Sequence, residues 1–283
     1  MDVIIERGCG LDVHKETIVA CVMGEGIKKE IRTFSTMTED LFRLKSWLSE
    51  KGITHVAMES TGPYWKPVFN VLEDSFEVIL ANARHIKNVP GRKTDVKDSE
   101  WICKLLRSGL LAASFVPPQA IRELRDLTRY RRKLTQSISA EKNRVQKVLE
   151  DANVKISSVV SDTFGVSASR MIEAIMAGNL DTEAISDLAV GKLKGKKEEL
   201  KKALVVNFQE HHRFMIQASL DHIESSEKII AGLDQEIARK LKDYHKEYEL
   251  LQTIPGVKEQ GAASILAEIG ADMDIFPSEV LLS

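Results

Sequence analysis

Four acidic residues in the sequence have the chemistry and spacing of a metal site. Asp12 lies in the middle of the apolar stretch GLDV, where a carboxylate is normally excluded unless it is paired or bound to a metal. Glu59 ends the apolar stretch ITHVAME, and Asp95 and Asp98 lie three residues apart near the start of a predicted helix, on one face of it. Divalent cations that prefer oxygen ligands are the usual means of holding such carboxylates together. The four residues therefore predict a site for Mg²⁺.

A carboxylate cluster that holds two divalent ions is suited to phosphoryl transfer on a nucleic acid. One ion helps to generate the nucleophile, and the other stabilises the leaving oxygen of a phosphodiester. Taken singly, three of the acids have simpler interpretations: Asp98 as an exposed helix residue, Asp95 as a helix cap and Glu59 as a surface acid at a strand end. Asp12 is the hardest to explain in this way, so the four together indicate a catalytic site.

The elements that must bring these acids together have the order β-β-β-α-β-α-β-α. Alternating apolar residues predict the strands, and apolar residues at helical spacing predict the helices between them. The last helix of this region is predicted to be capped by Thr94. The predicted strands are 7–13, 17–23, 29–35, 53–59 and 76–82, and the predicted helices are 38–51, 61–74 and 94–109.

Three antiparallel strands followed by βα units are typical of the ribonuclease-H-like fold, an α/β fold with a mixed sheet flanked by helices. In such a sheet the first and fourth strands lie side by side. Asp12 and Glu59 are therefore expected to be neighbours. The fold by itself does not determine the function.

The rest of the chain is predicted to be helical. Residues 120–154 have a helical pattern and a strongly basic composition, and residues 155–212 have the pattern of short helices joined by turns. From Ile216 to Leu251, apolar positions recur at alternating spacings of four and three, which predicts a coiled coil. This helix is too long to lie across one small domain, so it is expected to pair with 120–154 or with a second protomer.

Two basic segments are candidates for contact with nucleic acid. Residues 84–107 hold seven Lys or Arg and three acids, and residues 122–147 hold nine Lys or Arg and three acids. Such segments can follow a phosphate backbone, although a solvated helix face is the alternative for the second. The candidate residues are Arg84, Lys87, Arg92, Lys93, Arg122, Arg125, Arg129, Arg131, Arg132 and Lys133.

Composition sets limits on other functions. The formal net charge is −2, so the basic segments are offset elsewhere in the 283 residues. The chain has no apolar run of the roughly 18 residues that a membrane span requires, and its N-terminus does not have the pattern of a signal peptide. A cytoplasmic protein without membrane contact is expected. The three cysteines lack the spacing of a metal site and are predicted to be buried thiols, and His14 is predicted to be a surface or structural residue.

Four segments together resemble the DEDD-type insertion-sequence transposases, which are bridge-RNA-guided recombinases. The segments are GLDVHKETIVACV, AMESTGPYWKPVFNVLE, NARHIKNVPGRKTDVKDSEWICKLL and LLQTIPGVKEQGAASILAEIG. The resemblance implies a RuvC-like domain at 1–115 that uses Asp12, Glu59, Asp95 and Asp98, a helical connector at 116–248 and an incomplete C-terminal transposase domain at 249–283. It also implies DNA transposition and recombination, a structured guide RNA, and a dimer or tetramer formed through the coiled coil.

The chain departs from the family at its C-terminus. The family's C-terminal domain carries a serine beside a glycine that acts as the strand-cleaving nucleophile, and the contexts of Ser278 and Ser283 do not match it. Residues 254–257 resemble the turn of a DNA-backbone-binding helical hairpin, but Lys258 replaces the usual glycine, and an ordinary packing turn is the alternative. Two further functions stay open: a truncated, non-catalytic protein that binds nucleic acid, and a stand-alone metal-dependent junction nuclease.

Overall fold

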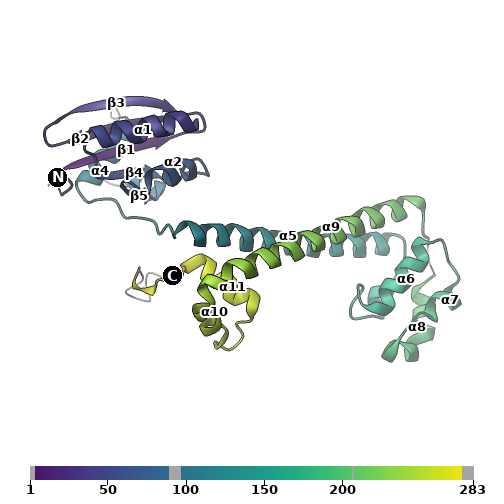
Figure 1. Ribbon diagram of the computed structural model, residues 1–283. Coiled ribbons are helices and arrows are strands. Elements are labelled where there is room, and N and C mark those ends of the chain that lie inside the picture. Colours follow the sequence, from purple (N-terminus) through teal and green to yellow (C-terminus); the bar gives the residue numbers. More distant parts are fainter. Residues whose placement is uncertain (1–3, 89–96, 206, 276–283) are drawn as a thin grey trace. The chain divides into compact units, whose positions relative to one another are not determined.

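The protein, seen here as a computed structural model, is described over residues 4–88, 97–205 and 207–275. It divides into two compact units, Met1–Val116 and Pro117–Ser283 (Figure 1). The first unit contains a β-sheet with helices, and the described part of the second is helical. The proposed acids belong to the first unit.

The sheet of the first unit has five strands in the order β3-β2-β1-β4-β5. β1 pairs antiparallel with β2 and parallel with β4, β2 pairs antiparallel with β3, and β4 pairs parallel with β5. The predicted mixed sheet, with its first and fourth strands adjacent, is confirmed. The strands are β1 (Arg7–Val13), β2 (Thr17–Gly24), β3 (Ile27–Ser35), β4 (His55–Glu59) and β5 (Glu77–Ala81).

Helices cover both faces of this sheet, because side chains alternate between the faces along each strand. On one face, Leu11 and Met58 pack with apolar residues of α1 (Thr38–Glu50) and α2 (Trp65–Leu72). On the other face, Ala57 packs with Trp101 and Ile102 of α4 (Asp98–Arg107). The short helix α3 (Ala83–Asn88), which the sequence did not predict, adds Ile86 to this second cluster. The face of the sheet that α4 covers is the one relevant to the proposed acids.

Two predicted helix starts differ from the structure. α2 begins at Trp65 rather than at residue 61, because Gly62 has a φ of +60°, which a helix does not accommodate. α4 begins at Asp98, and Lys97 at its N-cap has φ −59° and ψ 145°, outside the helical region. Thr94, the predicted cap of this helix, lies outside the described residues.

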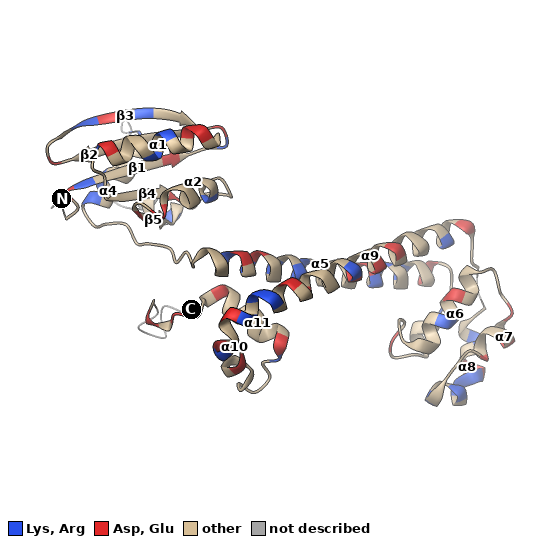
Figure 2. Ribbon diagram, in the orientation of Figure 1, with Lys and Arg blue, Asp and Glu red and all other residues tan. Residues whose placement is uncertain are grey.

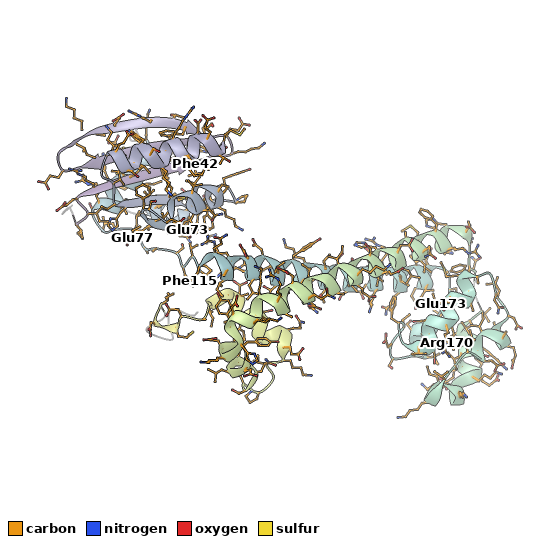
Figure 3. The ribbon with its side chains drawn as sticks, in the orientation of Figure 1. Phe42, Glu73, Glu77, Phe115, Arg170 and Glu173 are labelled. Carbon is orange, nitrogen blue, oxygen red and sulfur yellow. The ribbon has the colours of Figure 1, made fainter. Side chains whose placement is uncertain are left out.

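The second unit consists of helices and 3₁₀ turns. In chain order they are α5 (Gln119–Asp151), η1 (Ile156–Ser158), α6 (Val166–Met176), α7 (Thr182–Ser186), η2 (Gly191–Lys196), α8 (Lys197–Ala203), α9 (Glu210–Leu241), η3 (Lys242–Tyr244), α10 (His245–Gln252), α11 (Glu259–Ile269) and η4 (Met273–Ile275). Met171 and Ile172 of α6 are buried, whereas Arg170 and Glu173 are exposed on its outer side (Figure 3). The short helices that the pattern of 155–212 predicts are present, and they share a core with Val145 and Leu149 of α5 and Ile216 of α9.

The two long helices, α5 and α9, pack along each other within one chain (Figure 1). This answers the question that the sequence left open, because residues 120–154 supply a partner for the heptad segment. The predicted continuous helix from Ile216 to Leu251 is wrong, since α9 ends at Leu241 and the turn η3 separates it from α10. Tyr244 and Tyr248 instead pack in a cluster formed by α5, α9 and α11.

The three cysteines confirm the prediction of buried thiols. Cys9, Cys21 and Cys103 are free and buried. Burial raises the pKa of the Cys9 thiol, and the hydrogen bond with Cys21, followed by burial, raises the pKa of Cys103. A metal-binding cysteine is a thiolate, so the raised pKa values of Cys9 and Cys103 disfavour that role, while the hydrogen bond with Cys103 lowers the pKa of Cys21. Among the described residues no helix is both long enough and apolar enough to cross a membrane.

Candidate metal site and nucleic-acid surface

Asp12 and Glu59 occupy neighbouring positions on two parallel strands. The register pairs Leu11 of β1 with Met58 of β4, so the next residue along each strand brings Asp12 beside Glu59. Leu11 and Met58 point into the core under α1, and alternation therefore directs both acids to the opposite face, where α4 packs. The first two acids share one face at adjacent positions.

Two glycines on β1 allow α4 to lie against this face. An added Cβ at Gly8 would stand 3.1 Å from Leu106 and 3.2 Å from Arg107. At Gly10 it would fall closer than 3.0 Å to the backbone of Ser99 and Cys103. Progress along β1 from Gly8 to Gly10 thus corresponds to progress along α4 toward its N-terminus. Asp12, two residues further on the same face, stands toward the end of α4 that begins with Asp98.

The other two proposed acids belong to this end of α4. Asp98 is the first residue of α4 and is exposed. Asp95 lies outside the described residues, as do Ser278 and Ser283. The fold therefore brings three of the four acids to one region: Asp12 and Glu59 by strand register, and Asp98 by the course of α4.

The carboxylates of the two strand acids have hydrogen-bond partners two residues away in sequence. His14 Nε2 lies 3.1 Å from Asp12 Oδ2, and the hydroxyl of Thr61 donates to Glu59 Oε1. His14, predicted to be a surface or structural residue, is exposed and contacts Asp12. Thr61 is not among the residues that the sequence predicts. The i, i+2 spacing to each acid was the only available signal. Within the described ranges, no three His, Cys, Asp or Glu side chains are grouped closely enough to hold an ion as they stand.

Glu100 is an acid of the same helix that is already neutralised. Lys104 Nζ lies 2.7 Å from one of its oxygens and Lys29 Nζ lies 3.0 Å from the other. Hydrogen bonds from Lys104 and then from Lys29 hold the pKa of Glu100 below its ordinary value. Glu100 can therefore serve as a control for the proposed ligands, because it lies close to Asp98 in sequence but its carboxylate is already paired with two lysine ammonium groups.

The donor chemistry and the backbone placement at this face fit a divalent cation. Carboxylate oxygens are the ligands that Mg²⁺ and related ions use. The side chain of Asp12 is 27% exposed, so its carboxylate is accessible from solvent, while the strand beneath it is buried. Asp12, Glu59 and Asp98 could hold such an ion after their side chains turn from their present partners.

The basic candidates in the first unit are only partly described. Arg84 is exposed on α3, and Lys87 belongs to the same helix. Arg92 and Lys93 lie outside the described residues. Their contact with nucleic acid stays a prediction from the sequence.

Several basic candidates on α5 make contacts within the second unit. Arg125 donates to the backbone carbonyls of Ala267 (3.0 Å) and Glu268 (2.7 Å). Arg129 holds the Glu268 carboxylate with two hydrogen bonds, of 2.8 and 2.7 Å, which raise its own pKa and lower that of Glu268. Arg131 likewise donates two hydrogen bonds to the carboxylate of Asp234 on α9. Arg122 donates to the carbonyl of Pro117. Arg125 and Arg129 thus link α5 to α11, and Arg131 links α5 to α9, whereas the bond of Arg122 stays at the start of α5.

Arg132 and Lys133 are also exposed, as Arg129 is, but no acid holds either of them in an ion pair in the described part of the chain, and Tyr130 nearby is 48% exposed. Figure 2 shows the Lys and Arg positions along α5. The guanidinium of Arg132 and the ammonium of Lys133 suit contact with a phosphate backbone, and the ring of Tyr130 suits stacking on an unstacked base. These three residues are exposed positions of the predicted basic stripe.

The predicted helical hairpin is present as α10 and α11. The turn between them is exposed from Thr253 to Gly256, and Gly256 has a φ of +87°, which favours glycine. α11 packs on α5 through Ala263 and Leu266. The structure thus gives two helices with an exposed turn, and both predicted roles of that turn remain compatible with it.

A family model described as a transposase, of the IS110 DEDD type, matches residues 9–154, about half of the chain. The match includes Asp12, Glu59, Asp95 and Asp98, together with α5. No curated protein matches the sequence.

Proposed function

The chain belongs to the IS110 family of DEDD transposases, and from this premise we propose that it cuts and rejoins DNA at a divalent-metal site formed by Asp12, Glu59, Asp95 and Asp98. Mg²⁺ is the proposed ion. The observation that carries the proposal is the parallel register of β1 and β4, which makes Asp12 and Glu59 neighbours on the face of the sheet that α4 covers.

The proposal treats the first unit as a ribonuclease-H-like, RuvC-like domain. Its support is the strand order β3-β2-β1-β4-β5 with three antiparallel strands followed by parallel ones. When bound, the ion supplies a Lewis acid for phosphoryl transfer. The protein's own part is to hold carboxylates at the end of β4, on β1 and at the start of α4, and to leave that region open to a DNA strand.

The second unit is proposed to bind the nucleic acid. The exposed residues Tyr130, Arg132 and Lys133 on α5 support contact with DNA. A structured guide RNA and an oligomer formed through the helical region are proposed from the sequence resemblance alone. We propose that Arg125, Arg129 and Arg131 shape this surface indirectly, because they link α5 to α11 and α9. Arg122 is proposed to do so through its bond at the start of α5.

The test is cleavage of branched DNA by the purified full chain with Mg²⁺ or with EDTA. Cleavage is expected with Mg²⁺ only, and it should be lost in Asp12→Asn and in Glu59→Gln. Glu100→Gln is the matched control, since Glu100 is bound to Lys29 and Lys104, and it should retain cleavage. Unchanged cleavage by Asp12→Asn would contradict the proposal.

A further inference from the structure

Ser99 carries a buried hydroxyl without a hydrogen-bond partner. The residue is 0% exposed, and its Oγ has no partner among the described residues. Two other buried side-chain atoms in the described part of the chain share this property, Trp47 Nε1 and Arg213 Nε. Trp47 belongs to α1, on the other face of the sheet, and Arg213 belongs to the second unit. Buried polar groups are nearly always paired, so an unpaired one needs an explanation.

The position of Ser99 on α4 places it next to the proposed metal site. Its backbone carbonyl lies directly over Gly10, and Asp12 follows two residues later on the same face of β1. In sequence it adjoins Asp98. Ser99 is therefore in the first turn of the helix that delivers one proposed ligand, against the strand that carries another.

The direction of the side chain follows from helix geometry. Every Cα–Cβ bond in an α-helix is tilted toward the helix N-terminus. Because α4 runs so that its N-terminal end lies toward Asp12, the Ser99 side chain leans from the level of Gly10 toward that of Asp12. Since Ser99 is fully buried, its hydroxyl lies between α4 and the sheet rather than in solvent.

We infer that Ser99 is a positioning residue whose hydroxyl donates a hydrogen bond to the carboxylate of Asp12 once that carboxylate turns from His14 toward a divalent ion. A carboxylate has several acceptor sites, so Asp12 can accept this bond and still offer an oxygen to the ion. Groups that orient metal ligands in this way commonly change metal affinity by roughly 10- to 100-fold when they are removed. The inference rests on the proposed function.

The experiment titrates the full chain with Mn²⁺ alone, by calorimetry and by electron paramagnetic resonance, in four forms. These are the unmodified chain, Ser99→Ala, Cys103→Ala and Asp12→Asn. Ser99→Ala is expected to weaken Mn²⁺ binding by roughly tenfold or more. Its thermal midpoint without metal should be equal or higher, because alanine favours helix and the variant no longer buries an unpaired hydroxyl.

Cys103→Ala is the matched control, because Cys103 lies one turn further along the same buried stripe of α4, away from Asp12. It should leave Mn²⁺ affinity unchanged even if it lowers the thermal midpoint. Equal Mn²⁺ affinity in Ser99→Ala and the unmodified chain would overturn the inference while the proposed function stands. So would an equal loss of affinity in Ser99→Ala and Cys103→Ala, which would indicate loosened packing.

The proposed function fails separately. If the unmodified chain does not bind Mn²⁺, or if Asp12→Asn binds it equally well, Asp12 is not a metal ligand and the inference about Ser99 falls with it. The Asp12→Asn form thus tells the two failures apart.

Discussion

The backbone carbonyl of Ser99 lies where a Cβ of Gly10 would have to be. This contact allows α4 to lie directly on β1, with its N-terminus toward Asp12. A small sequence feature, the two glycines of the stretch RGCGLDV, thus determines how close the helix that carries Asp98 comes to the strand that carries Asp12.

The first prediction concerns Gly10→Ala. An added methyl group would meet backbone atoms of Ser99 and Cys103, which cannot move without shifting α4. We expect a loss of about 1–3 kcal/mol in the free energy of unfolding of the first unit, the usual effect of overpacking. Urea unfolding followed by circular dichroism measures it.

Gly8→Ala is the control for this prediction. Its added methyl group would meet side-chain atoms of Leu106 and Arg107 at 3.1 and 3.2 Å, and these can adjust. The loss should therefore be smaller than for Gly10→Ala. Equal losses of unfolding free energy in the two variants would show that the backbone contact at Gly10 costs no more than the side-chain contacts at Gly8.

The second prediction concerns the stability of the chain without metal. Asp12 and Glu59 are like charges at adjacent positions of paired strands, an arrangement that is destabilising. Without metal, Asp12→Asn and Glu59→Gln should each raise the free energy of unfolding by about 0.2–1 kcal/mol. Excess Mg²⁺ should stabilise the unmodified chain, by about 2.7 kcal/mol at one hundred times its dissociation constant, and should not stabilise either variant.

Thermal unfolding with and without Mg²⁺ measures both effects. Glu100→Gln serves as the comparison: it removes two ion pairs, so it should lower stability without metal and keep the response to Mg²⁺. A Mg²⁺ response of Asp12→Asn equal to that of the unmodified chain would contradict the prediction.

The third prediction concerns binding to nucleic acid. The double substitution of Arg132→Ala with Lys133→Ala removes two exposed cations from α5 and should weaken DNA binding. Each lost phosphate contact lowers the salt dependence of the binding constant, so the slope against the logarithm of salt concentration should fall by about 2. Fluorescence anisotropy with a labelled duplex over a range of salt concentrations measures this slope.

Arg131→Ala is the matched control on the same helix turn. Because Arg131 is bound to Asp234 of α9, its loss should lower the stability of the helical unit and change the slope little. If Arg131→Ala changes the slope as much as the double variant does, it is wrong to treat Arg131 as a residue that links helices and Arg132 and Lys133 as the residues that bind DNA.

The fourth prediction concerns pH. Arg129 holds the pKa of Glu268 below its unfolded value, so this pair stabilises the fold above the unfolded carboxyl pKa of about 4.3. The contribution is lost as the pH falls through the folded-state pKa. Because both side chains are largely exposed, it should be only about 0.5–1 kcal/mol.

Glu268→Gln isolates this contribution. The difference in urea midpoint between Glu268→Gln and the unmodified chain should be present at pH 7 and smaller at pH 3. Glu249→Gln, which removes an exposed acid paired only with His245 across one helical turn, should show no comparable change at either pH. A difference that persists unchanged at pH 3 would contradict the assignment.

The sequence by itself determined the five strands, their approximate ends and the long helix α5. Alternation with a period of two and apolar residues at helical spacing are local signals, and they act on segments of the chain independently of its fold. The position of Asp12 within an apolar strand is a local signal of the same kind, and it is enough to mark the strand that carries the chemistry.

Only the tertiary structure decided which charges remain available. Arg129, Arg131, Arg132 and Lys133 are equivalent in sequence, but the packing of α9 and α11 on α5 places acids that bind the first two, whereas no acid holds the last two in an ion pair in the described part of the chain. In the same way, the heptad pattern through Leu251 did not reveal that the long helix ends before the turn at Lys242–Tyr244. The apolar residues Tyr244, Tyr248 and Leu251 keep the heptad spacing, but they pack in a cluster with α5 and α11. Partners distant in sequence set these outcomes, and no local pattern records them.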